Sequence, residues 1–212
     1  MKDFRLYTIT GEEFHSGRSM LEVMEEAVKG GSDIIQLRDK FSSKKEVFEK
    51  AKKLREMTAR YGAAFIVNDH IDVALAAGAD GIHLGQDDLP LSEARKIVGE
   101  DMIIGISTHA IEEAREAERN GADYIGVGPV FATKSKVDVI DPVTTSYVKQ
   151  VADEITIPFV AIGGIKLHNV DQVIDAGADR ICAISEIVGS TDIQGTCQAF
   201  LDKLDAKRRI EK

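Results

Sequence analysis

The sequence predicts an α/β protein, a single (β/α)8 TIM barrel with eight parallel strands that spans residues 1–212. A tag of the form Gly-(Ala/Ser)-Asp-x-Ile occurs four times and begins at Gly31, Gly78, Gly121 and Gly177. Each copy follows an amphipathic segment and precedes a short apolar run, which indicates a helix end, a tight turn and a buried strand. Four untagged apolar runs alternate with these copies. Eight units in 212 residues leave about 26 residues each, enough for a strand, a helix and two short loops.

The expected elements follow one another in a regular order along the chain. The untagged strands are the apolar runs 6–9, 65–67, 103–106 and 159–162. Apolar residues at helical spacing predict helices over 43–59 and 108–120, with Thr108 as the N-cap of the second helix. Most strands are apolar on both faces, as parallel strands between a core and a helix layer are. A doubly wound open sheet with fewer strands is the alternative.

The composition narrows the function classes. A net charge of −9 is a poor match for non-specific nucleic-acid binding, and no apolar stretch approaches the roughly 18–20 residues of a membrane span. The two cysteines, Cys182 and Cys197, form no CxxC pair, so structural zinc is not expected. The start of the chain lacks the apolar core of a signal peptide, which favours a cytoplasmic protein. The oligomeric state stays open, and a homo-oligomer is compatible with the sequence.

Cationic side chains follow the second strand. In a parallel barrel the functional residues lie at the C-terminal ends of the strands. Gln36, Arg38 and Lys40 alternate along the chain, so they lie on one side. Two cations at a barrel mouth are costly without an anion, and arginine and lysine bind phosphate groups. These residues therefore predict a phosphate site. The alternative is a surface ion-pair cluster with Asp33 or Asp39.

Carboxylates follow the third and fourth strands. Asn68 and Asp69 come after the third strand, and Asp88 comes after the fourth. Mg²⁺ usually takes one or two carboxylates together with water and substrate phosphate oxygens. We therefore expect Asp69 and Asp88 to bind Mg²⁺. The alternative for Asp88 is a helix cap, because Pro90 follows it closely.

Three further polar residues lie in or after the fourth and fifth strands. His83 is inside the fourth strand, where a buried, hydrogen-bonded histidine is the simpler interpretation. Ser107 ends the fifth strand and is the better ligand candidate. His109 follows it and has the chemistry of a general acid or base, although a residue in the first turn of a helix is more often exposed.

A second phosphate site is expected on the opposite side of the mouth. The longest loop, 129–142, carries Thr133, Ser135 and Lys136 and suits a lid over phosphates; a solvated loop is the alternative. Gly163-Gly164 follows the seventh strand and Ile184-Ser185 follows the eighth, the usual place for a barrel phosphate site. The sequence thus predicts a metal-assisted diphosphate site that faces a monophosphate site.

These motifs, taken in order, closely resemble the thiamine phosphate synthase family over nearly the whole chain. The segments that carry the resemblance are 36–40, 68–69, 84–88, 107–109, 133–136, 162–165 and 184–185. The resemblance implies that a hydroxymethylpyrimidine diphosphate and a thiazole phosphate join to give thiamine phosphate and diphosphate. Diphosphate departs first, and the thiazole nitrogen captures the pyrimidine carbocation.

The resemblance also implies a role for each matching residue. The diphosphate end is held by Gln36, Arg38, Lys40, Asn68 and Lys136, and the pyrimidine substrate is contacted by Ser107. The thiazole phosphate is held by Thr133, Ser135, Gly164, Ile184 and Ser185. The catalytic group comprises Arg38, Lys40, Ser107 and Lys136. Mg²⁺ is the implied cofactor, on Asp69 and Asp88.

The sequence departs from the family pattern at two places near the loop. Ala132 stands where the family commonly has proline, and 143–145 reads Val-Thr-Thr where the family often has a glycine. Two rival functions remain: a thiazole tautomerase relative that uses His109, and a non-catalytic sensor of phosphorylated ligands. The combined metal and diphosphate residues favour the synthase over both.

Overall fold

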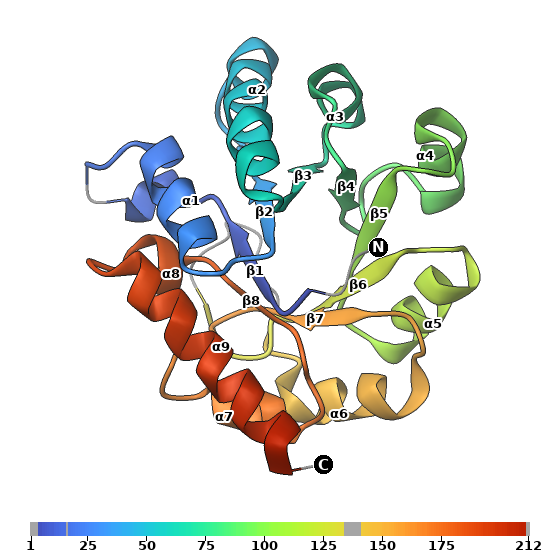
Figure 1. The fold of residues 1–212 in the computed structure, drawn as a ribbon. Coiled ribbons are helices and arrows are strands. Elements are labelled where there is room, and N and C mark those ends of the chain that lie inside the picture. The colour runs from blue at the N-terminus through green and yellow to red at the C-terminus, as the bar shows by residue number, and fades with distance from the viewer. Residues whose placement is uncertain (1–3, 16, 134–140, 211–212) are drawn as a thin grey trace.

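The computed structural model describes residues 4–15, 17–133 and 141–210. Figure 1 shows that the strands of this part of the chain close into one barrel, with the helices outside. Every neighbouring pair of strands is parallel. The strands are β1 (Leu6–Ile9), β2 (Ile34–Leu37), β3 (Ala64–Asn68), β4 (Gly81–Leu84), β5 (Ile103–Thr108), β6 (Tyr124–Val127), β7 (Phe159–Ala161) and β8 (Ile181–Ala183).

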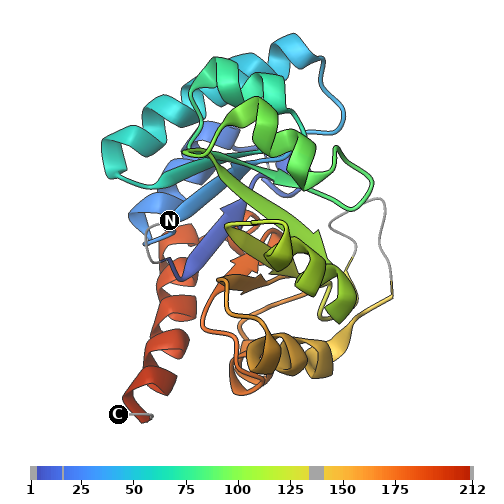
Figure 2. The same cartoon turned by 90° about the vertical axis from the view of Figure 1, so that its right-hand side faces the viewer.

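The helices follow the strands in alternation and form the outer layer. They are η1 (Glu12–Phe14), α1 (Met20–Lys29), α2 (Lys44–Tyr61), α3 (Ile71–Ala77), α4 (Leu91–Val98), α5 (Ile111–Arg119), α6 (Thr144–Glu154), α7 (Val170–Asp175), α8 (Ser185–Val188) and α9 (Ile193–Ile210). Helix α9, red in Figure 2, packs against α1, α7, α8 and β1. No helix among the described residues is both long enough and apolar enough to cross a membrane. The predicted barrel is confirmed, and β1 pairs with β8, which excludes the open-sheet alternative.

The repeated tag works as predicted at its glycines. Gly31, Gly78, Gly121 and Gly177 have φ angles of 99°, 64°, 84° and 106°. Residues with a β-carbon rarely adopt this left-handed region, so glycine suits the turn from helix to strand.

The aspartates of the tag connect the beginnings of neighbouring strands. In three copies the carboxylate accepts a hydrogen bond from a backbone N–H at the beginning of a neighbouring strand. The pairs are Asp33 with Leu6 (3.0 Å), Asp80 with Phe65 (2.8 Å) and Asp123 with Ile104 (2.8 Å). These contacts lie at the N-terminal ends of the strands, where conserved contacts in a barrel serve stability, so the tag stabilises the fold.

The two predicted helices are present, with one difference at a helix start. Helix α2 begins after Ser43, whose hydroxyl accepts a hydrogen bond from the Glu46 backbone N–H in a capping box. Thr108 does not cap α5, so that prediction is wrong: Ala110 occupies the N-cap position. Thr108 is the last residue of β5, and its buried hydroxyl donates to the Gly126 carbonyl at 3.1 Å. Thr108 pairs with Val127 of β6, so it belongs to the sheet and the helix begins only after it.

Candidate active site

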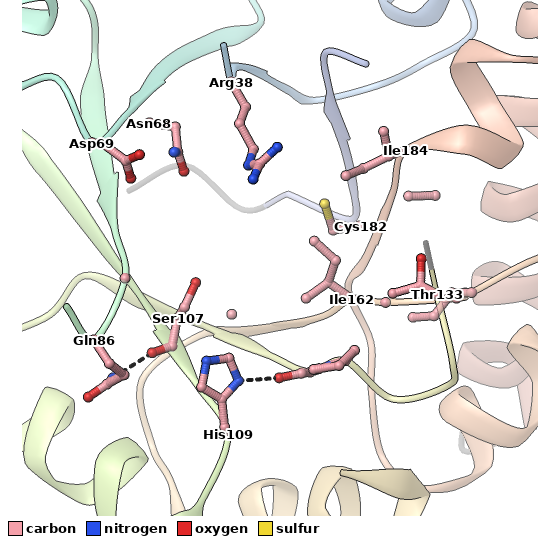
Figure 3. A pocket seen from close by; sticks show the side chains of 18 of the residues that line it. Arg38, Asn68, Asp69, Gln86, Ser107, His109, Thr133, Ile162, Cys182 and Ile184 are labelled. Atoms are coloured by element: carbon pink, nitrogen blue, oxygen red, sulfur yellow. Dashed lines mark hydrogen bonds between the residues drawn. The ribbon is translucent and has the colours of Figure 1, made fainter. Parts of the chain in front are cut away.

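A cavity of about 430 Å³ lies at the mouth of the barrel, where the strands end. Figure 3 shows Arg38, Asn68 and Asp69 on one side of it and Thr133 and Ile184 on the other. Parallel strands bring their C-terminal ends to one face, so side chains far apart in the sequence converge here.

Most of the residues predicted for the site line this cavity. They are Arg38, Lys40, Asn68, Asp69, Asp88, Ser107, Thr133, Gly164, Ile184 and Ser185. Gln36 is the exception among the described residues: it is only 1% exposed and lies deeper in the barrel, where its Nε2 donates to the Tyr7 hydroxyl at 2.7 Å. Ser135 and Lys136 lie outside the described residues, together with most of the predicted lid.

The loop after β2 presents its cations to the cavity and turns its carboxylate away. The Arg38 backbone N–H donates to Thr10 Oγ1 at 2.9 Å. Asp39 accepts from Lys50 Nζ at 2.7 Å, and this contact lowers the pKa of Asp39 against the effect of its burial. Within the described residues, no protein group forms a hydrogen bond or ion pair with the Arg38 guanidinium. The alternative, in which Arg38 pairs with Asp33 or Asp39 in a surface cluster, is therefore not formed, and Arg38 can accept an anion.

Asp69 and Asp88 form the carboxylate side of the cavity. Asp69 pairs with Lys40 Nζ and has a φ of 60°, uncommon for a residue with a side chain. Asp88 accepts from the Gly85 backbone N–H at 2.7 Å rather than capping α4, whose N-cap position is Pro90. Burial raises the pKa of Asp88, and the hydrogen bond with Asp69 and then the charge of Asp69 raise it further.

This carboxylate pair fits a divalent cation. Two like charges that disfavour each other are relieved by a cation between them. No group of three or more histidine, cysteine, aspartate or glutamate side chains with metal-site geometry occurs among the residues the structure describes. A two-carboxylate site of this kind suits Mg²⁺, which completes its coordination with water and phosphate oxygens.

Ser107 is held from two directions at the end of β5. Its hydroxyl lies 2.9 Å from His83 Nε2, and its carbonyl accepts from Gln86 Nε2 at 2.6 Å. His83 is 9% exposed and its Nδ1 lies 2.9 Å from the Tyr124 hydroxyl, which confirms the buried, hydrogen-bonded interpretation of this histidine.

His109 also lines the cavity. Its Nδ1 lies 2.5 Å from the Gly128 carbonyl, which can only accept a hydrogen bond, so Nδ1 carries the proton (Figure 3). The neighbouring backbone is anchored from α6, where the Tyr147 hydroxyl donates to the Ala110 carbonyl at 2.9 Å. Burial raises the pKa of Tyr147 to about 12, so this donor stays protonated.

Two things require glycine in the turn after β7: the backbone conformation of the turn and the residues that pack against it. Gly163 and Gly164 have φ angles of 98° and 63°. A β-carbon on Gly163 would lie 2.4 Å from Pro129 Cα, and one on Gly164 would lie 2.7 Å from the Ala132 carbonyl oxygen. The turn therefore packs against the start of the loop after β6, in addition to lining the cavity.

Three residues that were not predicted for the site help to shape it. Gln86 donates to the Ser107 carbonyl, and Tyr7 and Tyr124 fill the barrel beneath the cavity. A tyrosine in each of two buried strands was a usable signal, because its hydroxyl needs a partner inside the barrel.

Together the fold and the cavity define a class: a (β/α)8-barrel enzyme whose site suits small phosphorylated molecules. The family model described as "Thiamine monophosphate synthase" matches residues 6–187. The chain belongs to this family, which makes it a transferase of thiamine biosynthesis.

Individual relatives agree over the full length. A thiamine-phosphate synthase from Halalkalibacterium halodurans is 71% identical over 207 residues, 98% of this chain and 98% of that protein. One from Shouchella clausii is 65% identical over 205 residues, 97% of this chain and 98% of that protein. The solved thiamine phosphate pyrophosphorylase from Pyrococcus furiosus is 37% identical with a TM-score of 0.86, and the match covers 96% of each chain.

Proposed function

We propose that the chain couples 4-amino-2-methyl-5-hydroxymethylpyrimidine diphosphate to 4-methyl-5-(2-phosphooxyethyl)thiazole, giving thiamine phosphate and diphosphate. One observation carries the proposal: a single cavity has a cationic and carboxylate half that suits a diphosphate, opposite a glycine and hydroxyl half that suits a monophosphate. The high identity to thiamine-phosphate synthases over the whole chain supports the same conclusion.

The proposed reaction is a dissociative substitution. The bond between the pyrimidine methylene carbon and the diphosphate oxygen breaks, and its electron pair leaves with diphosphate. The thiazole nitrogen then donates its lone pair to the carbocation, which creates the C–N bond and leaves the ring positively charged. No proton has to be removed, so the site needs stabilisation of the leaving group more than it needs a base.

Each predicted site residue that lines the cavity has a part in this reaction. Arg38 and Lys40 bind the departing diphosphate, with Asn68 beside them, and Ser107 contacts the pyrimidine substrate. Asp69 and Asp88 would hold Mg²⁺, and a bound Mg²⁺ would supply positive charge beside the leaving group.

The thiazole phosphate occupies the opposite half of the cavity. There it is held by Thr133, Gly164, Ile184 and Ser185. By the family resemblance, Ser135 also holds the thiazole phosphate and Lys136 also holds the diphosphate. Both cysteines are buried, and neither forms a disulfide among the described residues, which suits the reducing cytoplasm, where we place the protein.

The test is Mg²⁺-dependent release of diphosphate by the purified protein, measured with and without the thiazole phosphate. We expect thiamine phosphate to appear only when both substrates and Mg²⁺ are present. Arg38→Ala should lower turnover by at least ~100-fold, the scale of a lost transition-state contact. Arg60→Ala, an exposed arginine on α2 with a side chain 63% exposed, is the matched control and should leave turnover unchanged. Equal turnover in the two variants would exclude this assignment of the diphosphate site.

The rival functions give different results in the same assay. A tautomerase would convert a thiazole without releasing diphosphate, and it would lose its activity in His109→Ala. A ligand sensor would bind both phosphorylated compounds without turnover. For the synthase, His109→Ala retains substantial coupling activity, because the coupling step moves no proton.

A further inference from the structure

A chain of buried hydrogen bonds crosses the barrel beneath the cavity and ends at Ser107. Gln36 Nε2 donates to the Tyr7 hydroxyl at 2.7 Å, and the Tyr7 and Tyr124 hydroxyls are 2.9 Å apart. The Tyr124 hydroxyl lies 2.9 Å from His83 Nδ1, and His83 Nε2 lies 2.9 Å from Ser107 Oγ. The five residues come from β2, β1, β6, β4 and β5, so only the closed barrel brings them together.

The two tyrosines in this chain stay protonated. Tyr7 is 1% exposed and Tyr124 is 0% exposed. Burial raises the pKa of both phenols well above its ordinary value. Each hydroxyl therefore contributes one donated hydrogen and accepts through its oxygen.

Because each group can donate only the hydrogens it carries, the hydrogen bonds from Gln36 to Ser107 all run in one direction. Gln36 donates to Tyr7, so the only hydroxyl hydrogen of Tyr7 is left for Tyr124. Tyr124 accepts it and must direct its own hydrogen to His83 Nδ1. In a neutral imidazole the other nitrogen then carries the hydrogen, so His83 Nε2–H donates to Ser107 Oγ.

The direction determines what Ser107 offers to the cavity. Its oxygen accepts from His83, and no described protein group accepts its hydroxyl hydrogen. Ser107 lines the cavity, so this hydrogen is available to an acceptor on the bound substrate. In the opposite direction Ser107 would donate to His83 and could not donate to a ligand.

A glycine on β5 provides the space that the chain of hydrogen bonds needs. A β-carbon on Gly105 would lie 2.1 Å from Tyr124 Cζ and 2.4 Å from its hydroxyl oxygen. The Tyr124 ring therefore occupies the volume that any other residue at 105 would fill, and the hydroxyl is held between Tyr7 and His83.

We propose that His83 is a positioning residue whose Nε2–H, oriented by the chain from Gln36 through Tyr7 and Tyr124, holds Ser107 as a hydrogen-bond donor to the oxygen that gains charge as diphosphate leaves. The inference rests on the proposed function for the identity of that oxygen. The direction of the chain does not depend on it.

The direction is tested first, without substrate, by nitrogen NMR of protein labelled at its five histidines. The His83 resonances are assigned as those missing in His83→Gln. We expect a protonated Nε2 and an unprotonated Nδ1. In Tyr124→Phe the donor to Nδ1 is gone, so the two neutral tautomers should both be populated. A protonated Nδ1 in the wild-type protein overturns the proposal.

Two amide substitutions separate the contacts of His83. The Gln side chain places its NH2 near the position of Nε2, so His83→Gln keeps a donor to Ser107. The Asn side chain reaches only the position of Nδ1, so His83→Asn keeps the contact with Tyr124 and loses Ser107. We expect His83→Asn to lower kcat about 10- to 100-fold with little change in either KM, because the contact acts on the transition state. His83→Gln should recover most of kcat.

A double-mutant cycle shows whether His83 acts through Ser107. Ser107→Ala should lower kcat about as much as His83→Asn, and the double variant should lose no more than either single variant. Additive losses, or equal losses in His83→Gln and His83→Asn at equal melting temperature, overturn the positioning role. If the wild-type protein makes no thiamine phosphate, the proposed function fails, while the NMR result still decides the direction of the chain.

Discussion

Thr144 begins α6 with a φ of 66°, in the left-handed region of the backbone. A β-branched residue with this conformation is rare, because its β-carbon crowds the backbone. It occurs within 143–145, the segment where the family resemblance leads us to expect a glycine. We predict that Thr144→Gly stabilises the protein, although most changes to glycine destabilise.

The size of the effect follows from three contributions. Relief of the left-handed conformation gains about 2 kcal/mol for a β-branched residue. The greater freedom of glycine in the unfolded chain costs about 0.5–1 kcal/mol. The hydroxyl contact with Ser146 at 2.6 Å is exposed, so its loss costs a few tenths of a kcal/mol at most. The net gain is about 1 kcal/mol in the free energy of unfolding, or about 2–4 °C in Tm for a chain of this size.

Circular dichroism during heating measures this shift, and urea unfolding gives the free energy directly. Thr145→Gly is the matched control, since the next residue lies inside the helix, where the lower helix propensity of glycine should cost a few tenths of a kcal/mol. The two variants should therefore move Tm in opposite directions. A fall in Tm for Thr144→Gly as large as that for Thr145→Gly would refute the strain argument.

Three further predictions follow from single contacts. Asp69→Ala and Asp69→Gly should both lose at least ~100-fold in turnover, but the Gly variant should be about 0.5–1 kcal/mol more stable than the Ala variant by urea unfolding, because φ is 60° there and the relief of strain exceeds the cost of the greater freedom of glycine in the unfolded chain; equal stability would contradict this. Gly164→Ala should lower the free energy of unfolding by at least about 1–2 kcal/mol, since its β-carbon meets the Ala132 carbonyl at 2.7 Å. The pKa of Asp39 is lowered in the folded state, so its ion pair with Lys50 stabilises above the ordinary aspartate pKa of about 3.9 and is lost as pH falls below it. Urea unfolding should show a stability gap between wild type and Asp39→Asn at pH 7 that narrows below about pH 4, and a gap that does not change with pH would contradict it.

The local pattern of the sequence was enough to predict the barrel and the face that carries the site. Apolar runs, helical spacing and the repeated glycine tag depend on neighbouring residues, so eight strands could be placed from the sequence alone. Arg38, Asp69 and Ser107 follow strand ends, and parallel strands necessarily bring such residues to one face of a barrel.

Only the tertiary structure decided how these residues are used. Gln36 lies below the cavity because the register places its amide against Tyr7. Thr108 ends a strand rather than capping a helix because β5 pairs with β6 up to that residue. The hydrogen-bond chain to Ser107 joins five strands from all over the sequence, and the direction of each bond is set by partners that no local pattern contains. The sequence by itself thus determined which residues reach the mouth of the barrel, and the packing of the interior determined their partners, because those contacts exist only once the barrel has closed.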